Sequence, residues 1–462
     1  MRFTRRLTDR RSPRAFVLFS SAVIAGAAWS CGSDDARDPL AEDPPDASSS
    51  DVAQVPGDAS AEDVSRPRDA GLVDAAPHPV VCTSAPCAVS LVTSSLAPSS
   101  DASEYEEGFC TLMEDRTVVC WGANASGQLG RGEEAGSTDS ATPARVVGLS
   151  NVVSLHHTCA VDEDGAAFCW GTGPFAENGT EITTARAPVK LPIPGASHVD
   201  ATSTTACAVT SDTVRCWGRN ENAQVGPFTT HSRQGMFEPT VIPLAVAGPV
   251  RDIVMSRATF IVHADGTTES WGGNPPLGRP SPLFPDPYPH SLAIGEIGNL
   301  DVGDENACAT AGGIGYCWGK TLPSFTESTP PKLDLANTLP SAVSTPEPVV
   351  QIATTANVVK YELGAPIAQR QRWCAIGVSG SVYCWGNNTS GQAGDGTKNH
   401  AYEAVKVVGL PAPAAQVKTA PESTCALLTS GKVYCWGSNY YGQLGNGNIR
   451  QPSLTPQEVV MP

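Results

Sequence analysis

The chain repeats one pattern of hydrophobic and polar positions seven times. Short runs of β-forming residues, such as Thr117-Val118-Val119 and Lys432-Val433-Tyr434, alternate with polar turns rich in glycine. Each repeat contains a Trp-Gly pair, and successive pairs lie 47 to 67 residues apart. The tryptophans are Trp121, Trp170, Trp217, Trp271, Trp318, Trp385 and Trp436. A period near 50 residues without helical periodicity predicts an all-β fold of propeller blades.

Pairs of cysteines mark the turn of a hairpin in six repeats. Two pairs enclose eight residues, which suits a two-residue turn such as Gly312-Gly313, and four pairs enclose nine, which suits a three-residue turn ending in glycine. Each pair then faces across adjacent antiparallel strands, close enough for a disulfide. The pairs are Cys110 with Cys120, Cys159 with Cys169, Cys207 with Cys216, Cys308 with Cys317, Cys374 with Cys384, and Cys425 with Cys435.

The fourth repeat lacks both cysteines and has Phe260 and Ser270 in their places. Loss of both together is expected when the two are bonded to each other. Metal binding is the alternative, but the spacing is not C-x₂-C and no histidine accompanies the pairs. We predict six hairpin disulfides, a seventh between Cys82 and Cys87 at the start of the domain, and no metal or cofactor.

One repeat shows the whole motif: residues 425–447 read CALLTSGKVYCWGSNYYGQLGNG. This motif resembles the repeat of the regulator-of-chromosome-condensation superfamily, and the resemblance covers residues 82–462. It implies a seven-bladed β-propeller. We expect the last strand, near residues 455–460, to complete the first blade and so close the ring. Some relatives are guanine-nucleotide exchange factors, a role that an exported acidic protein does not fit.

Residues 1–30 resemble an export signal, with an arginine-rich start and an apolar run too short to span a membrane. The following Ala28-Trp29-Ser30-Cys31 resembles a bacterial lipobox, whose cysteine carries the lipid. Conventional signal cleavage nearby is the alternative. Fifteen cysteines make seven pairs plus Cys31, which favours lipidation. Residues 31–81 are acidic and poor in large apolar side chains, so we expect a disordered linker.

Composition and charge argue against several classes of function. A net charge of −17 argues against a nucleic-acid partner, and fifteen cysteines indicate an oxidising compartment. The eight histidines are scattered, and His156 and His157 should point to opposite faces of a strand. We find no catalytic set, and no inner pair of carboxylates of the kind that a polysaccharide-active enzyme needs.

We therefore expect a monomeric, non-catalytic scaffold, anchored by its lipid to the outer membrane or cell surface of a bacterium. It would bind an envelope or extracellular protein or a glycan; an extracellular polysaccharide-active enzyme is the alternative. The candidate binding segments are the long loops at residues 226–237, 275–289 and 321–348, which are either display loops or spacers. We expect the tryptophans to pack between blades. The asparagines three residues after them should bond to the backbone of turns.

Overall fold

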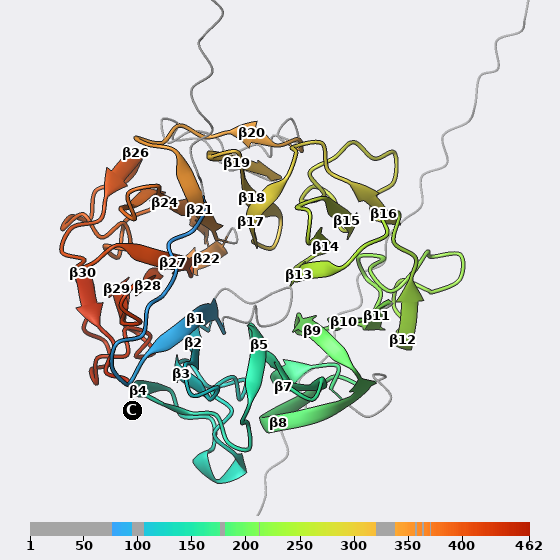
Figure 1. The fold of residues 1–462 in the computed structure, drawn as a ribbon, viewed down its shortest axis with the longest axis horizontal. Helices are drawn as coiled ribbons and strands as arrows, with labels where there is room; N and C mark the ends of the chain where they lie inside the picture. The colour runs from blue at the N-terminus through green and yellow to red at the C-terminus, as the bar shows by residue number, and fades with distance from the viewer. Residues whose placement is uncertain are drawn as a thin grey trace, which may run out of the picture. The chain divides into compact units, whose positions relative to one another are not determined.

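The computed structural model describes residues 76–94, 106–175, 181–211, 213–319, 338–355, 358–362, 365–369 and 371–462. The predicted signal segment, Cys31 and nearly all of the predicted linker lie outside these residues. Seven four-stranded sheets follow one another around a ring, as Figure 1 shows. The described residues hold one short 3-10 helix, Glu133–Ala135, and no α-helix. The predicted seven-bladed, all-β propeller is confirmed.

The first four blades are built from consecutive strands. Blade one comprises β1 (Ala88–Thr93), β2 (Gly108–Met113), β3 (Val118–Gly122) and β4 (Ser140–Arg145). Blade two comprises β5 (Val152–His156), β6 (Cys159–Asp162), β7 (Ala166–Gly173) and β8 (Thr183–Pro194). Blade three comprises β9 (Ala196–Ala201), β10 (Thr205–Thr210), β11 (Val214–Arg219) and β12 (Met236–Ile242). Blade four comprises β13 (Val250–Met255), β14 (Ala258–His263), β15 (Thr268–Gly272) and β16 (Asp286–Ser291).

The other three blades follow the same plan, with one insertion. Blade five comprises β17 (Ile297–Val302), β18 (Asn306–Ala311), β19 (Ile314–Gly319) and β20 (Ser341–Ala342). Blade six comprises β21 (Val349–Thr354), β24 (Arg372–Gly377), β25 (Val382–Gly386) and β26 (Ala401–Lys406). Blade seven comprises β27 (Ala414–Thr419), β28 (Ser423–Leu428), β29 (Val433–Gly437) and β30 (Ser453–Glu458). The insertion is a hairpin of β22 (Val358–Glu362) and β23 (Ala365–Gln369).

The central hairpins turn where the cysteine spacing places them. In blade five, Ala311 pairs with Ile314, and Gly312 and Gly313 form the two-residue turn with φ of 57° and 80°. Positive φ at both positions is the geometry that such a turn requires. The turn length therefore follows from the number of residues between the cysteines.

All of the cysteine pairs predicted for the propeller are disulfides. In the six hairpin pairs, the two cysteines face each other across adjacent strands with Cα atoms 4.1 Å apart. The bonds join Cys110 to Cys120, Cys159 to Cys169, Cys207 to Cys216, Cys308 to Cys317, Cys374 to Cys384, and Cys425 to Cys435. Cys82 and Cys87 form the seventh bond, ahead of the first strand.

The ring does not close in the way that the sequence led us to expect. The last strand, β30, pairs with β29 in blade seven, and blade one takes its outermost strand, β4, from its own repeat. The physical reason is that each blade begins with its innermost strand, so that no blade lacks a strand. Side-chain and backbone contacts close the ring instead: the Leu91 N–H donates to Gln416 Oε1 at 2.8 Å and the Ala88 N–H to the Gly431 carbonyl at 2.9 Å.

The repeat tryptophans join neighbouring blades, as predicted. Six of them donate their indole N–H to a backbone carbonyl of the preceding blade, at 2.7 to 3.0 Å. Trp121 does this across the closing seam, where its acceptor is Gln443. Trp385 differs, since its ring stacks on Trp373 within blade six. A buried indole needs a hydrogen-bond acceptor for its N–H. These hydrogen bonds therefore fix the position of each blade relative to the preceding blade.

Candidate functional site

The two ends of the strands carry different loops, and this gives the propeller two faces. The hairpin face holds the tips of the central hairpins, and the loop face holds the turns after Trp-Gly and the connections from first to second strands. A groove of about 360 Å³ lies on the loop face of blades three to five. It is lined by Glu221, Asn222, Arg233, Arg257, Gly273, Asn274, Pro275, Phe284, Pro285 and Glu305. We treat this groove as the candidate binding site.

Two of the three predicted binding loops meet at the groove. Arg233 comes from the loop at 226–237, and Pro275, Phe284 and Pro285 come from the loop at 275–289. The third loop, at 321–348, falls largely outside the described residues, and its described part does not line the groove. The sequence therefore identified the loops, and the placement of blades three and four brings them together.

The groove opens where the turn of blade four is short. In blade one, Asn124 accepts a hydrogen bond from the Leu129 N–H, five residues on, and Asn220, Asn388 and Asn439 make the equivalent bond in their blades. In blade four, Asn274 stands three residues before the equivalent leucine, Leu277. Its side-chain oxygen has no hydrogen-bond partner among the described residues. The prediction for the asparagines thus holds in four turns and is wrong for Asn274.

Ion pairs fix most of the charges around the groove. Arg257 bonds to Asp304 at 3.0 Å and to Glu305 at 3.1 Å, and Glu221 pairs with Arg219 at 3.0 Å. Arg233 forms no ion pair with the described part of the chain. Phe284 is 73% exposed beside it. A free guanidinium next to an exposed aromatic ring is a combination that protein partners commonly use as an anchor.

Buried contacts hold the loop that carries Phe284. Arg279 pairs with Asp286 at 2.8 Å and donates to the backbone carbonyls of Ser270 and Tyr288. Burial would raise the pKa of Asp286, but hydrogen bonds from the Tyr288 backbone, Ser281 and Arg279 lower it below its ordinary value. Asp286 is therefore ionised at neutral pH. These contacts restrain the loop, and a restrained loop loses less entropy on binding.

A second polar cluster lies on the innermost strands, around the axis of the ring. His157 bonds to Asp200 at 2.8 Å, and Lys418 bonds to Asp301 at 2.7 Å. Burial opposes the charge on His157, yet Asp200 raises its pKa above the usual value. The sequence predicted no acidic pair here, and Asp200, Asp301 and Lys418 were not among the predicted site residues. Aligning the seven innermost strands would have placed Asp200, Asp301 and Lys418 at one strand position.

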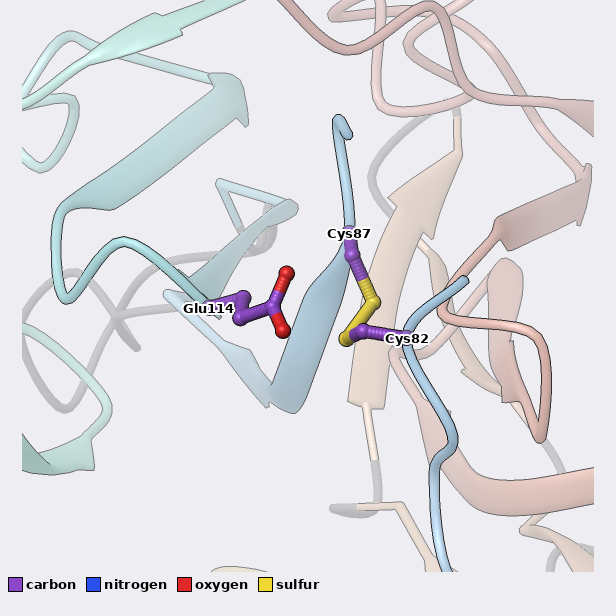
Figure 2. Close-up of side chains that lie close together, drawn as sticks. All are labelled: Cys82, Cys87 and Glu114. Carbon is purple, nitrogen blue, oxygen red and sulfur yellow. A yellow bond between two sulfur atoms is a disulfide. The ribbon is translucent and has the colours of Figure 1, made fainter. Parts of the chain in front are cut away.

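The disulfide at the start of the domain lies close to a carboxylate. Ligand atoms of Cys82, Cys87 and Glu114 lie within 4.8 Å of one another, a spacing that a metal ion could bridge. Figure 2 shows the two sulfurs joined to each other, with Glu114 beside them. Since metals bind the thiolate, this disulfide offers no thiolate ligand while it is oxidised.

Seven four-stranded blades, each with a Trp-Gly turn, define the chain as a repeat-built seven-bladed β-propeller. The model of the family described as regulator of chromosome condensation (RCC1) repeat matches residues 422–443, within the last copy. The chain thus contains RCC1-type repeats. Seven disulfides indicate an oxidising, extracellular location. None of the described residues forms a helix with the length and apolar character needed to cross a membrane.

Relatives match about three quarters of the chain. The ultraviolet-B receptor UVR8 of Arabidopsis thaliana is 25% identical over 379 residues, covering 76% of this chain and 67% of UVR8. The human E3 ubiquitin-protein ligase HERC2 is 23% identical over 373 residues, which cover 76% of this chain and only 6% of HERC2. Yeast RCC1 (Prp20), solved with Kap60 bound to it, has a TM-score of 0.58 at 16% identity over 74% of this chain and 83% of its own. Human WBSCR16 has a TM-score of 0.58 at 17% identity, over 75% of this chain and 94% of its own. These structures share the fold.

Proposed function

We propose that the chain is an exported bacterial lipoprotein whose propeller binds a protein partner at the cell envelope, through the groove on blades three to five. In this proposal residues 1–30 direct export, Cys31 carries the lipid, and residues 31–81 form a tether. The propeller performs no chemistry of its own. Its task is to present a fixed, disulfide-bonded binding surface outside the cytoplasm.

The observation that carries the proposal is the meeting of two long loops around Phe284 and Arg233. Phe284 is 73% exposed although the loop that holds it is fixed by the buried Arg279–Asp286 pair. An aromatic side chain kept in water by a rigid loop has no role in the core. The RCC1-like fold is compatible with a protein-binding scaffold, and yeast RCC1 (Prp20), which has this fold, was solved with Kap60 bound to it. Exchange activity in the cytosol is not part of the proposal, because the disulfides indicate an oxidising location.

The described part of the chain ahead of blade one lies away from the groove. The N-terminal arm, residues 76–87, lies against hairpin tips of blades six and seven: His78 Nε2 is 3.0 Å from the Val378 carbonyl, and the Val81 N–H donates to the Thr429 carbonyl at 2.8 Å. These tips belong to the hairpin face. The groove lies on the loop face, so this arm does not cover it.

Site-specific photo-crosslinking tests the proposal. The full chain, made in its native host, would carry benzoylphenylalanine at position 284 or, as a control, at position 241, where Val241 is 45% exposed on β12. We expect one protein to crosslink from position 284 and not from position 241, and Arg233→Glu to abolish that product. Equal products from both positions, or a product indifferent to Arg233→Glu, would contradict the groove as the binding site.

A further inference from the structure

A second cavity, of about 470 Å³, lies on the hairpin face where the innermost strands meet the N-terminal arm. Blades five, six and seven contribute Asn299, Gln351 and Gln416 to it, and the arm contributes residues 77–80. In Figure 1 the arm runs past β21 and β27 before it enters β1. The innermost strands line one side of the cavity, and residues 77–80 of the arm line the other.

The three carboxamides occupy the same position on three consecutive innermost strands. Each directly follows a β-bulge, which lies between Ile297 and Asn299 in β17, between Val349 and Gln351 in β21 and between Ala414 and Gln416 in β27. Bulges change the direction in which a side chain points and are common beside binding sites. The corresponding residues of the other blades are Ser90, Ser154, His198 and Asp252, so the three carboxamides form a local set.

The oxygen of each carboxamide is already used. The N–H of Ile352 donates to Asn299 at 3.0 Å, that of Val417 to Gln351 at 2.7 Å and that of Leu91 to Gln416 at 2.8 Å. Each donor belongs to the next blade, and these bonds satisfy backbone groups at the open edge of its innermost strand. Because the oxygen is held, the amide plane has one orientation, and the NH₂ group points away from the backbone donor.

The three NH₂ groups remain available. No described residue accepts a hydrogen bond from them, and none of them is among the enclosed polar atoms that lack a partner. They are consequently open to the cavity. Its lining residues include no carboxylate, lysine or arginine, and the apolar surface comes from Pro77, Pro79, Val80, Val89 and Ala415. Several fixed donors against an apolar wall are typical of a small-molecule site, and such sites commonly enclose roughly 300 to 1,000 Å³.

We propose that this cavity binds a single sugar unit, whose hydroxyl and ring oxygens accept hydrogen bonds from the carboxamides of Asn299, Gln351 and Gln416. A ligand rich in acceptor oxygens fits fixed N–H donors, and a neutral sugar fits a lining without carboxylate, lysine or arginine side chains. The site is separate from the groove and lies on the opposite face. It gives the propeller a glycan-binding function that is independent of its protein partner.

The test is calorimetric titration of the oxidised full chain with a hexose, an N-acetylated hexosamine and a hexuronate, each as a free monosaccharide. We expect saturable binding of at least one of them. Gln351→Glu keeps an oxygen for the Val417 N–H but replaces the NH₂ donor by an acceptor, so affinity for the neutral sugars should fall by about tenfold or more. Preference for the hexuronate over the hexose would contradict the neutral ligand that the lining favours.

Two controls separate binding from folding and from the groove. Gln457→Glu, on the outermost strand of blade seven, makes the same chemical change away from the cavity and should leave affinity unchanged. Phe284→Ala alters the groove and should likewise have no effect on sugar binding. Absence of saturable binding of all three sugars would overturn the proposal. So would equal affinities in Gln351→Glu and the unaltered chain at matched melting temperatures, or loss of sugar binding in Phe284→Ala.

Discussion

Blade four and the other six blades hold their two central strands together in different ways. In the six, a disulfide joins the two central strands beside the repeat tryptophan. In blade four, Phe260 and Ser270 face each other at that position. The Phe260 ring is buried against Trp318, and Ser270 Oγ donates to the Leu277 carbonyl at 2.7 Å. Packing and a hydrogen bond thus replace a covalent bond in the one blade that carries the long loop of the groove.

Blade four also buries a histidine–carboxylate pair within its own central hairpin. His263 and Glu269 are almost fully buried and lie 3.0 Å apart, and Glu269 accepts the backbone N–H groups of Ala245 and Val246. Such a pair is costly to break, because the remaining partner is left buried without compensation. The stability of blade four should therefore depend on these non-covalent contacts. The stability of the other six blades should depend on whether their disulfides are oxidised.

Reduction of the disulfides should have the largest effect. Each hairpin disulfide closes a loop of about ten residues and contributes about 2 to 3 kcal/mol to the free energy of unfolding. Scanning calorimetry with and without a reductant should show a fall in melting temperature of at least about 10 °C. An unchanged melting temperature after thiol titration has verified full reduction would show that the disulfides contribute little.

Removing the buried carboxylate of blade four should come next. Glu269→Ala leaves His263 and two backbone N–H groups unpaired, and we expect a loss of about 3 to 5 kcal/mol in urea unfolding of the oxidised protein. Glu458→Ala is the matched control. It removes a carboxylate from the exposed Lys432–Glu458 pair and should cost less than about 1 kcal/mol. Similar losses in the two variants would refute the special dependence of blade four on its buried pair.

Glu107, at the seam between blades one and seven and away from blade four, should make the stability of the protein depend on pH. Burial, reinforced by the charge of Glu422, raises the pKa of Glu107 to about 7 despite hydrogen bonds from Ser423 and the Glu422 backbone and the nearby Arg372. The fold favours the protonated acid, so its stabilisation is complete below pH 4.5 and is lost as the pH rises through 7.

The loss amounts to up to about 3 kcal/mol of unfolding free energy. Glu107→Gln should remove this part of the pH dependence between pH 4.5 and 8, as measured by urea unfolding at each pH. A variant with the same pH profile as the unaltered chain would show that Glu107 does not titrate in this range.

A disulfide engineered into blade four would make it resemble the others. Phe260→Cys with Ser270→Cys places two thiols at facing positions of the same kind, and mass spectrometry without reductant should detect the bond. Loss of the Phe260 ring should lower the free energy of unfolding by about 3 to 5 kcal/mol, and the new disulfide should raise it by about 2 to 3 kcal/mol. We expect a net destabilisation of about 1 to 2 kcal/mol in urea unfolding. A clear gain in stability would mean that Phe260 packs less well than its burial indicates.

The smallest effect on stability is expected at the groove. Phe284→Ala should change the free energy of unfolding by less than about 0.5 kcal/mol, because the ring is mostly in water. Urea unfolding measures this change. A loss above 1 kcal/mol would assign Phe284 a structural role and remove the main support for the binding groove.

The features that were predictable from the sequence are those set by local spacing. Cysteine spacing fixes the turn length, and Cys308 and Cys317 face each other because Gly312 and Gly313 turn the chain between them. Ring closure was predicted wrongly, since it depends on which strand of a repeat is innermost. The sequence did not reveal that Arg233 and Phe284 line one groove, because this depends on how two blades pack.

Hydrogen exchange of the oxidised and the mildly reduced chain, measured strand by strand, would separate covalent from non-covalent stabilisation of the hairpins. We predict that the central hairpins of the six disulfide-bonded blades lose protection on reduction. The β14–β15 hairpin, held by Phe260, Ser270 and the His263–Glu269 pair, should change least. Loss of protection in β14–β15 equal to or greater than that in the disulfide-bonded hairpins would contradict this prediction.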